Sequence, residues 1–181
     1  MKDLRPYLKY YWLEKQYLLK EIAVNFKERG HLTAEEFFAI VIWKSNRSKT
    51  KVLKGVKKTG KTVQQITEEI NKEKDRAKKV EILDKIDGIG IPIASAILTV
   101  CYPGDFTIVD YRIKRTIKKM GLSFKGDPSA SVPAYLKYLD ICRTKITKEQ
   151  GLSLRDTDRA LWGFDFYEGK NGLKDLVRKL R

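Results

Sequence analysis

Signals that start and stop helices recur along the chain, and they constrain the fold more than any other feature of the sequence. The stretches TAEE, from Thr33 to Glu36, and TVQQ, from Thr62 to Gln65, have the pattern of a capping box, in which the first and fourth residues exchange hydrogen bonds at a helix start. Pro92 suits the first turn of the apolar stretch IPIASAILTVC, and Pro103 prevents that helix from continuing. These signals predict a chain of short helices.

The helices predicted in this way account for most of the 181 residues. The one candidate strand is a doubtful run at residues 107–109. We therefore predict an all-α bundle of about nine short helices in a single domain over residues 1–181, either undivided or as two lobes around a cleft, with a hinge between Gly121 and Ser131. The expected helices cover residues 4–26, with Gly30 as the end signal, and residues 33–44, 62–72, 76–85, 91–101, 110–120, 131–148 and 153–164.

The stretch GVKKTGKT, from Gly55 to Thr62, matches the phosphate loop of nucleotide-hydrolysing enzymes. Such a loop lies between a central strand of a parallel sheet and the helix that follows it. The residues before Gly55 are too rich in lysine for a buried strand, and no alternation of strands and helices surrounds them. A basic loop that ends at Thr62 as a helix cap accounts for the same residues, so we expect no ATPase activity.

Net charge is the strongest signal in the composition. The chain has 38 Lys and Arg against 23 Asp and Glu, which leaves a net charge of +15. Residues 44–61 contain eight basic side chains and no acidic one, and residues 112–125 contain six basic side chains and no acidic one. Two acid-free basic blocks in a small protein favour a polyanionic partner. Nucleic acid is the first choice, ahead of an anionic membrane or an acidic protein.

Cysteine usage and hydropathy exclude several classes of protein. The chain has two cysteines, Cys101 and Cys142, and no C-x-x-C pair or Cys/His cluster, so we expect no disulfide framework, no side-chain metal site and no iron–sulfur cluster. The N-terminal residues lack the apolar core of a signal peptide. The longest apolar stretch, Ile89 to Tyr102, is too short to span a membrane. We expect a cytoplasmic protein.

Two glycines separate the helix at residues 76–85 from the apolar helix at 91–101. Gly88 and Gly90 flank one apolar residue, which permits a tight turn and leaves backbone N–H groups uncovered. Those groups point outward at a helix N-terminus, where the helix dipole also favours an anion. The pattern is either an ordinary turn or a helix–hairpin–helix, which holds a nucleic acid by its backbone without regard to sequence.

The stretch from Leu83 to Gly121 resembles the helix–hairpin–helix DNA glycosylase superfamily, which includes endonuclease III. In that family an L-P-G-V-G hairpin leads into a helix with a T-A pair, and a V-D pair and a basic helix follow a loop that contains proline. The matching positions here are Ile86 to Gly90, Ile93 and Ala94, Pro103, Val109 and Asp110, and Arg115. The strong part of the resemblance, a hairpin at 83–101 and a loop and helix at 103–121, covers about 40 of the 181 residues.

The sequence departs from the family pattern at two points. Members that also cleave the sugar–phosphate backbone carry a lysine two residues after the second hairpin glycine, where this chain has Pro92, which has no amine for a Schiff base. The resemblance therefore implies a monofunctional enzyme, unless Lys85 or Lys114 replaces that lysine. The iron–sulfur cysteines of the family are also missing, so we expect no cofactor.

The resemblance implies a role for each candidate site residue. Asp110 matches the carboxylate that stabilises the oxocarbenium-like sugar and orients water, although Asp is also a common helix N-cap. The upstream stretch FFAIVIWKSNRSK looks like the family's apolar helix and DNA wedge, with Ser45, Asn46 and Arg47 as wedge residues. Trp43 and Trp162 are candidates for the base pocket, or for the core. The DNA backbone would contact Gly88, Ile89, Gly90, Lys44, Arg47, Lys49, Lys51, Arg112 and Arg115, and the hairpin carbonyls could hold a monovalent cation.

The expected activity is hydrolysis of the N-glycosidic bond of a damaged or mispaired base that is flipped out of double-stranded DNA. The protein would act as a monomer. The alternative is a non-catalytic helix–hairpin–helix module that recognises DNA structure or lesions.

Overall fold

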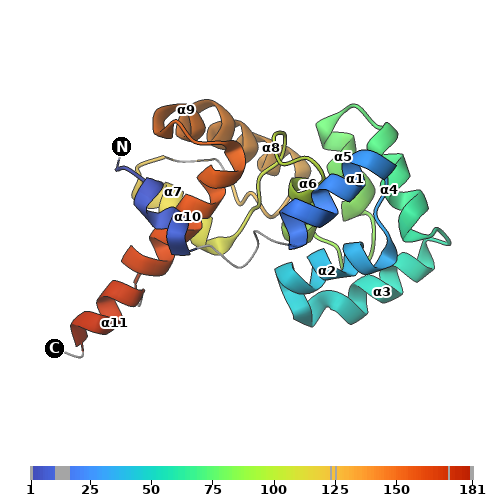
Figure 1. Cartoon of the computed structure of the whole chain (residues 1–181), viewed down its shortest axis with the longest axis horizontal. Coiled ribbons are helices and arrows are strands. Elements are labelled where there is room, and N and C mark those ends of the chain that lie inside the picture. The colour runs from blue at the N-terminus through green and yellow to red at the C-terminus, as the bar shows by residue number, and fades with distance from the viewer. Residues whose placement is uncertain (1, 11–16, 123, 125, 171, 180–181) are drawn as a thin grey trace.

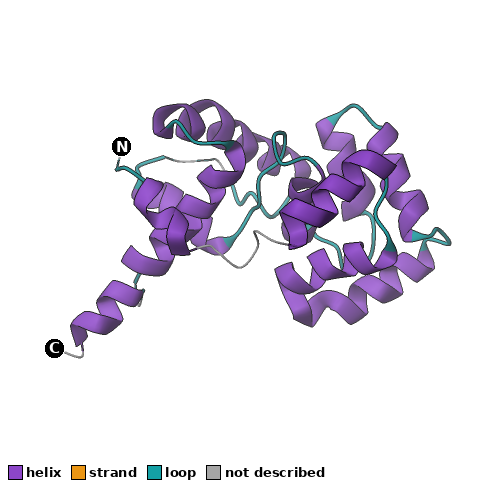
Figure 2. Ribbon diagram, in the orientation of Figure 1, coloured by secondary structure: helices purple, strands orange, loops and turns teal. Residues whose placement is uncertain are grey.

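The computed structural model describes residues 2–10, 17–122, 124, 126–170 and 172–179, and within these ranges the chain forms helices and loops but no strand (Figure 2). The predicted all-α class is therefore confirmed. The run at residues 107–109, which was a candidate strand, is instead a buried loop. No helix in the described part of the chain is both long enough and apolar enough to cross a membrane.

Eleven α-helices and four segments of 3-10 or π-helix lie in the described chain. The α-helices are α1 (Ala23–Arg29), α2 (Ala34–Ser45), α3 (Lys49–Lys58), α4 (Val63–Lys72), α5 (Arg76–Asp84), α6 (Ile91–Cys101), α7 (Tyr111–Lys119), α8 (Val132–Ile141), α9 (Thr147–Gln150), α10 (Leu154–Glu168) and α11 (Leu173–Lys179). The 3-10 or π-helical segments are η1 (Arg5–Tyr10), η2 (Leu18–Ile22), η3 (Asn46–Ser48) and η4 (Cys142–Ile146).

Both predicted capping boxes are present. The Thr33 hydroxyl accepts a hydrogen bond from the Glu36 N–H at 3.2 Å, and the Glu36 carboxylate accepts one from the Thr33 N–H at 2.9 Å. Thr62 and Gln65 make the same reciprocal pair at the start of α4. Gly30 ends α1 in the left-handed conformation, with φ of 79°. The predicted helix at 4–26 includes residues 11–16, which lie outside the described residues, as do residues 123 and 125 of the expected hinge.

Residues 49–58 form α3, which the sequence did not predict, so residues 55–58 of the expected basic loop at 55–62 are helical. Val52 and Val56 lie on the buried face of α3, while its lysines point outward. Gly55 lies between them, and a Cβ atom at this position would be only 1.9 Å from the Asp87 carbonyl oxygen. Gly55 therefore allows α3 to pack directly on the turn between α5 and α6. Because the residue lies inside a helix and no sheet is present in the described chain, the phosphate-loop pattern has a packing explanation.

The elements gather into two groups, which Figure 1 shows side by side. Helices α1 to α6 form one group, in which α6 packs against α1, α2 and α5. Helices α7 to α11 lie in the other group, and the N-terminal segment η1 joins them by packing on α10. Contacts between α5 and α8 connect the two groups.

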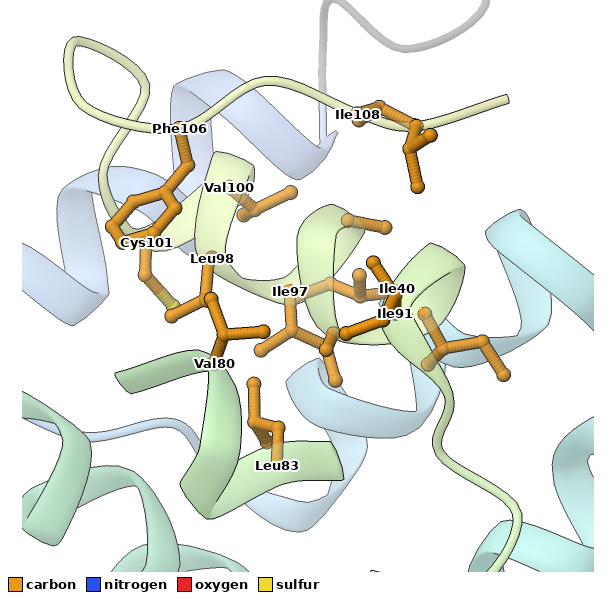
Figure 3. Packing of buried hydrophobic residues seen from close by; sticks show 14 of the residues in the cluster. Ile40, Val80, Leu83, Ile91, Ile97, Leu98, Val100, Cys101, Phe106 and Ile108 are labelled. Carbon is orange, nitrogen blue, oxygen red and sulfur yellow. The ribbon is translucent and has the colours of Figure 1, made fainter. Parts of the chain in front are cut away.

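Helix α6 is the centre of the hydrophobic core (Figure 3). Every residue of α6 except Pro92 is buried, and Ala94, Ser95 and Ala96 have no exposed surface. These small side chains allow neighbouring segments to approach closely. Each large aliphatic side chain buried here contributes about 1.5–3 kcal/mol relative to its exposed state. The core thus holds the turn before α6 and the loop after it in fixed positions.

Candidate functional site

A cleft of about 410 Å³ lies where the end of α2, the turn before α6 and the start of α7 meet. It brings together several residues that the sequence singled out from distant segments; Lys44 and Asp110, for example, are 66 residues apart. The residues that line it are Lys44, Ser45, Arg47, Ser48, Gly88, Gly90, Pro92, Ile93, Val109, Asp110, Tyr111, Lys114 and Ser129.

The carboxylate of Asp110 is held at the cleft by both of its oxygens. Asp110 is the N-cap of α7, and its Oδ1 accepts a hydrogen bond from the Arg112 N–H at 2.9 Å. Its Oδ2 lies 3.1 Å from Lys44 Nζ, which also donates to the Val109 carbonyl at 3.2 Å. The Asp110 side chain is 25% exposed and that of Lys44 is 11% exposed. The carboxylate is therefore oriented, paired and still open to the cleft.

The loop that carries Asp110 is buried, and side chains from other helices bind its polar groups. Tyr135 and Tyr138 of α8 donate to the carbonyls of residues 107 and 108 at 2.8 and 2.7 Å. Ser95 of α6 accepts from the Val109 N–H at 3.1 Å. A buried backbone group without a partner would be costly, so these bonds explain how the loop can run through the core. They also fix the position of Asp110.

The hairpin turn contributes two glycines, Gly88 and Gly90, to the lining of the cleft. Gly88 adopts φ of 88°, which is the left-handed region, and Gly90 is the N-cap of α6. Their N–H groups have no hydrogen-bond acceptor among the described residues. Ile89 differs, since its side chain is buried and its N–H donates to the Ile86 carbonyl at 2.9 Å. Of the three expected backbone contacts in the hairpin, the two glycines are therefore the ones with available donors.

The candidate basic contacts fall into two groups. Arg47 lines the cleft, is exposed, and has no acidic partner within 4 Å in the described chain. Lys49 and Lys51 are also exposed, on α3 beside the hairpin. Arg112 and Arg115, in contrast, both pair with one carboxylate oxygen of Asp165 on α10, whose side chain has no exposed surface. The hydrogen bond to Asp165 is the main cause of the raised pKa of Arg115.

The remaining wedge and pocket candidates are placed differently from one another. Ser45 lines the cleft, and its hydroxyl is 2.8 Å from that of Ser48. Asn46 is exposed next to the cleft and accepts a hydrogen bond from Lys49. Trp43 and Trp162 are both partly buried against the core, which favours their structural interpretation.

The two lysines considered as substitutes for a Schiff-base lysine lie in different places. Lys114 lines the cleft and pairs with Asp127 at 2.8 Å and with Ser129 at 3.1 Å. Lys85 lies in a separate surface hollow of about 520 Å³ that α4 and α5 line. Only Lys114 of these two is therefore a neighbour of Asp110.

Sequence reasoning missed Tyr111, Ser48 and Ser129 as cleft residues. Tyr111 directly follows Asp110, so its proximity could have been noticed, but its exposure could not be read from the sequence. Searches with protein-family models, among curated proteins and among solved structures each found no match. Within the described ranges, no three His, Cys, Asp or Glu side chains are grouped in a way that could hold a metal ion.

Proposed function

We propose that the protein is a DNA glycosylase that removes a damaged or mispaired base from double-stranded DNA. The observation that supports this function best is the position of Asp110, whose fixed carboxylate shares one cleft with two hairpin glycines that have free N–H groups. A backbone-binding turn next to a carboxylate is the arrangement needed to hold a nucleotide and stabilise positive charge on its sugar. The resemblance of residues 83–121 to helix–hairpin–helix glycosylases points to the same reaction.

The proposed mechanism begins with the DNA backbone. Phosphates would bind the N–H groups of Gly88 and Gly90 and the exposed side chains of Arg47 and Lys51. Flipping the base costs a few kcal/mol, and least for a damaged or mispaired base. The flipped nucleotide would enter the cleft with C1′ of its sugar beside Asp110.

Hydrolysis then requires a partner for the developing sugar cation. As the N-glycosidic bond lengthens, its electron pair leaves with the base, and the Asp110 carboxylate stabilises the oxocarbenium-like sugar. Water adds to C1′ and loses a proton to this carboxylate, which then passes it to solvent, and the departing base takes up a proton from solvent. Pro92 occupies the position of the lysine that would form a Schiff base, so water is the nucleophile in this proposal.

Asp110→Asn tests the function directly. Asparagine keeps an oxygen for the Arg112 N–H and can still cap α7, so the fold should remain. Without the negative charge, single-turnover base release should fall by about 10² to 10⁴. The substrates would be duplexes with a single uracil, mispaired thymine, hypoxanthine, 8-oxoguanine or alkylated purine. DNA affinity should be equal or higher, because a repulsive charge near the phosphates is removed.

Asp127→Asn is the matched control for this experiment. Asp127 is more exposed than Asp110, pairs with Lys114 at the edge of the cleft, and should be replaced with little effect on base release. Release by Asp110→Asn at the wild-type rate would exclude a catalytic role for this residue.

A second candidate function is a non-catalytic module that binds damaged or distorted DNA. The observation in its favour is that both oxygens of Asp110 are already engaged, one as a helix cap and one with Lys44. This function predicts tight, salt-dependent duplex binding without release of any base by the wild-type protein.

A further inference from the structure

Tyr111 is the most exposed of the large hydrophobic side chains in the described chain, at 55%. It lines the same cleft as Asp110 and is the next residue along the chain, so their Cα atoms are about 3.8 Å apart. The Tyr111 ring therefore borders a cleft that also contains an oriented carboxylate.

Two guanidinium groups support the Tyr111 ring. The Arg112 guanidinium carbon lies 5.3 Å from the ring centroid and that of Arg115 lies 5.1 Å from it. Both arginines are held by Asp165, which is fully buried on α10. A ring in contact with two anchored cations is oriented by cation–π attraction, which is favourable at such distances. Tyr111 is therefore a positioned side chain, although more than half of its surface is open.

The other aromatic candidates do not combine these properties. Trp43 and Trp162 are partly buried and packed against the core, and Trp162 also stacks on Phe166 with the ring centroids 5.4 Å apart. Tyr17 is exposed at 41% but does not line the cleft. Tyr111 alone among these four is exposed, supported and adjacent to Asp110.

We propose that Tyr111 is the stacking platform for the flipped base, in place of the two tryptophans. This inference rests on the proposed glycosylase function and adds the residue that binds the base. A base is planar and projects directly from C1′, so a base stacked on Tyr111 would leave its sugar near the carboxylate of the preceding residue. Every base has a π-face, so Tyr111 provides affinity for bases in general, and the edge contacts in the cleft would decide which base is accepted.

The test compares Tyr111→Leu, Tyr111→Phe and Tyr17→Leu with the wild type in a binding assay that needs no catalysis. Each protein is titrated with two sets of duplexes: those that carry a single uracil, mispaired thymine, hypoxanthine or 8-oxoguanine on a 2′-fluorinated sugar, which resists hydrolysis, and one that carries a tetrahydrofuran abasic analogue at the same position. The readout is the ratio of the two dissociation constants. A melting curve for each variant verifies folding.

The expected result is specific to the ring. Tyr111→Leu should reduce the preference of the protein for the base-bearing duplex by about 5- to 150-fold, which is the range for losing one base–aromatic stack. Affinity for the abasic duplex should be unchanged. Tyr111→Phe keeps the ring and should behave like the wild type, as should Tyr17→Leu, which removes an exposed ring away from the cleft.

Two results would overturn the assignment of Tyr111. One is a wild-type ratio in Tyr111→Leu, and the other is an equal loss of affinity for base-bearing and abasic duplexes, which would indicate a backbone contact. Failure of the glycosylase function is a separate result. If the wild type releases no base but Tyr111→Leu still loses its preference for base-bearing DNA, the stacking role of Tyr111 is supported and the proposed glycosylase activity is contradicted.

Discussion

At the scale of single residues, the contact between Lys44 and Asp110 determines how the carboxylate faces the cleft. Lys44 comes from the last turn of α2 and binds both the Asp110 carboxylate and the Val109 carbonyl. The ammonium group therefore fixes the side chain and the backbone of the same short segment. The sequence predicted that Lys44 contacts DNA, and the structure gives it an additional partner within the protein.

Lys44→Met should lower base release by about tenfold, because the carboxylate would keep only its helix-cap hydrogen bond and could rotate away from the sugar. The free energy of unfolding should fall by about 1–3 kcal/mol, which is typical for loss of a hydrogen bond to a charged group. Single-turnover kinetics and chemical denaturation measure the two effects.

Lys114→Met is the matched control for Lys44→Met. Lys114 also lines the cleft but pairs with Asp127, which is half exposed, so stability should change by less than about 1 kcal/mol. If Lys114→Met slowed base release as much as Lys44→Met, the effect would come from the charge of the cleft and not from the orientation of Asp110.

The residues of the site could be predicted only where the signal was local. Asp110 and the hairpin glycines were found because they lie within one short stretch of sequence. The pairing of Lys44 with Asp110 joins residues 66 positions apart, and that of Arg115 with Asp165 joins residues 50 apart. An ion pair between residues so distant in the sequence leaves no periodic pattern, so neither pair could be identified from one sequence.

At the scale of elements, the contact between α3 and the hairpin turn depends on two glycines, one on each side. Gly55 of α3 leaves room for the Asp87 carbonyl, and a Cβ atom at Gly88 would lie 2.8 Å from backbone atoms of Lys51 and Val52. A substitution at Gly88 therefore disturbs folding as well as any backbone binding. Gly90 is different, since a Cβ atom there would meet only Pro92, at 3.8 Å.

Gly55→Ala should destabilise the protein by about 3 kcal/mol or more, because the added methyl group would overlap a backbone carbonyl that cannot move freely. Alanine is otherwise favoured over glycine in a helix by about 1 kcal/mol, so the sign of the effect distinguishes close packing from helix propensity. Gly90→Ala is the control and should leave the melting temperature within a few degrees of the wild type. A more stable Gly55→Ala protein would contradict the observed contact.

Most elements could be predicted because their boundaries depend on neighbouring residues. The capping boxes at Thr33 and Thr62 were correct for this reason. Helix α3 was not predicted because Val52 and Val56 give it only a short apolar face, and the lysines and the glycine around them favour a loop. The buried part of the loop, residues 106–109, could not be predicted, since the tyrosines and serine that bind its polar groups lie on distant helices.

At the scale of the whole molecule, several ionisable groups are buried in their neutral form. Burial raises the pKa of the Cys142 thiol to about 12, and burial also raises the pKa values of Cys101, Tyr135 and Tyr138 above their usual ranges. An unfolded thiol titrates near pH 8.5. Above that pH the unfolded chain loses protons that the folded chain keeps, so the stability that these groups provide at neutral pH is lost as the pH rises.

Denaturation at pH 7 and pH 10 should show this loss. Cys142 alone should reduce the free energy of unfolding by about 1–2 kcal/mol over that interval, and the other groups add to it. Cys142→Ala should show a smaller decrease between the two pH values, even if it is less stable at both. Equal stability of the wild type at pH 7 and pH 10 would show that these groups are not buried as described.

The packing of η1 on α10 has a consequence for the order in which the chain acquires its structure. Tyr7 packs on Phe164, a Cβ atom at Gly163 would lie 2.1 Å from the Tyr7 carbonyl oxygen, and the Leu4 N–H donates to the side chain of Gln150. Residues 4–7 thus have partners that are synthesised about 150 residues later, which takes roughly 10 to 30 s at ordinary rates of synthesis. Helices α1 to α6 can assemble around nearby partners in the meantime. Docking of η1 is therefore a late event of folding, and until it occurs the face of α10 that holds Phe164 stays uncovered.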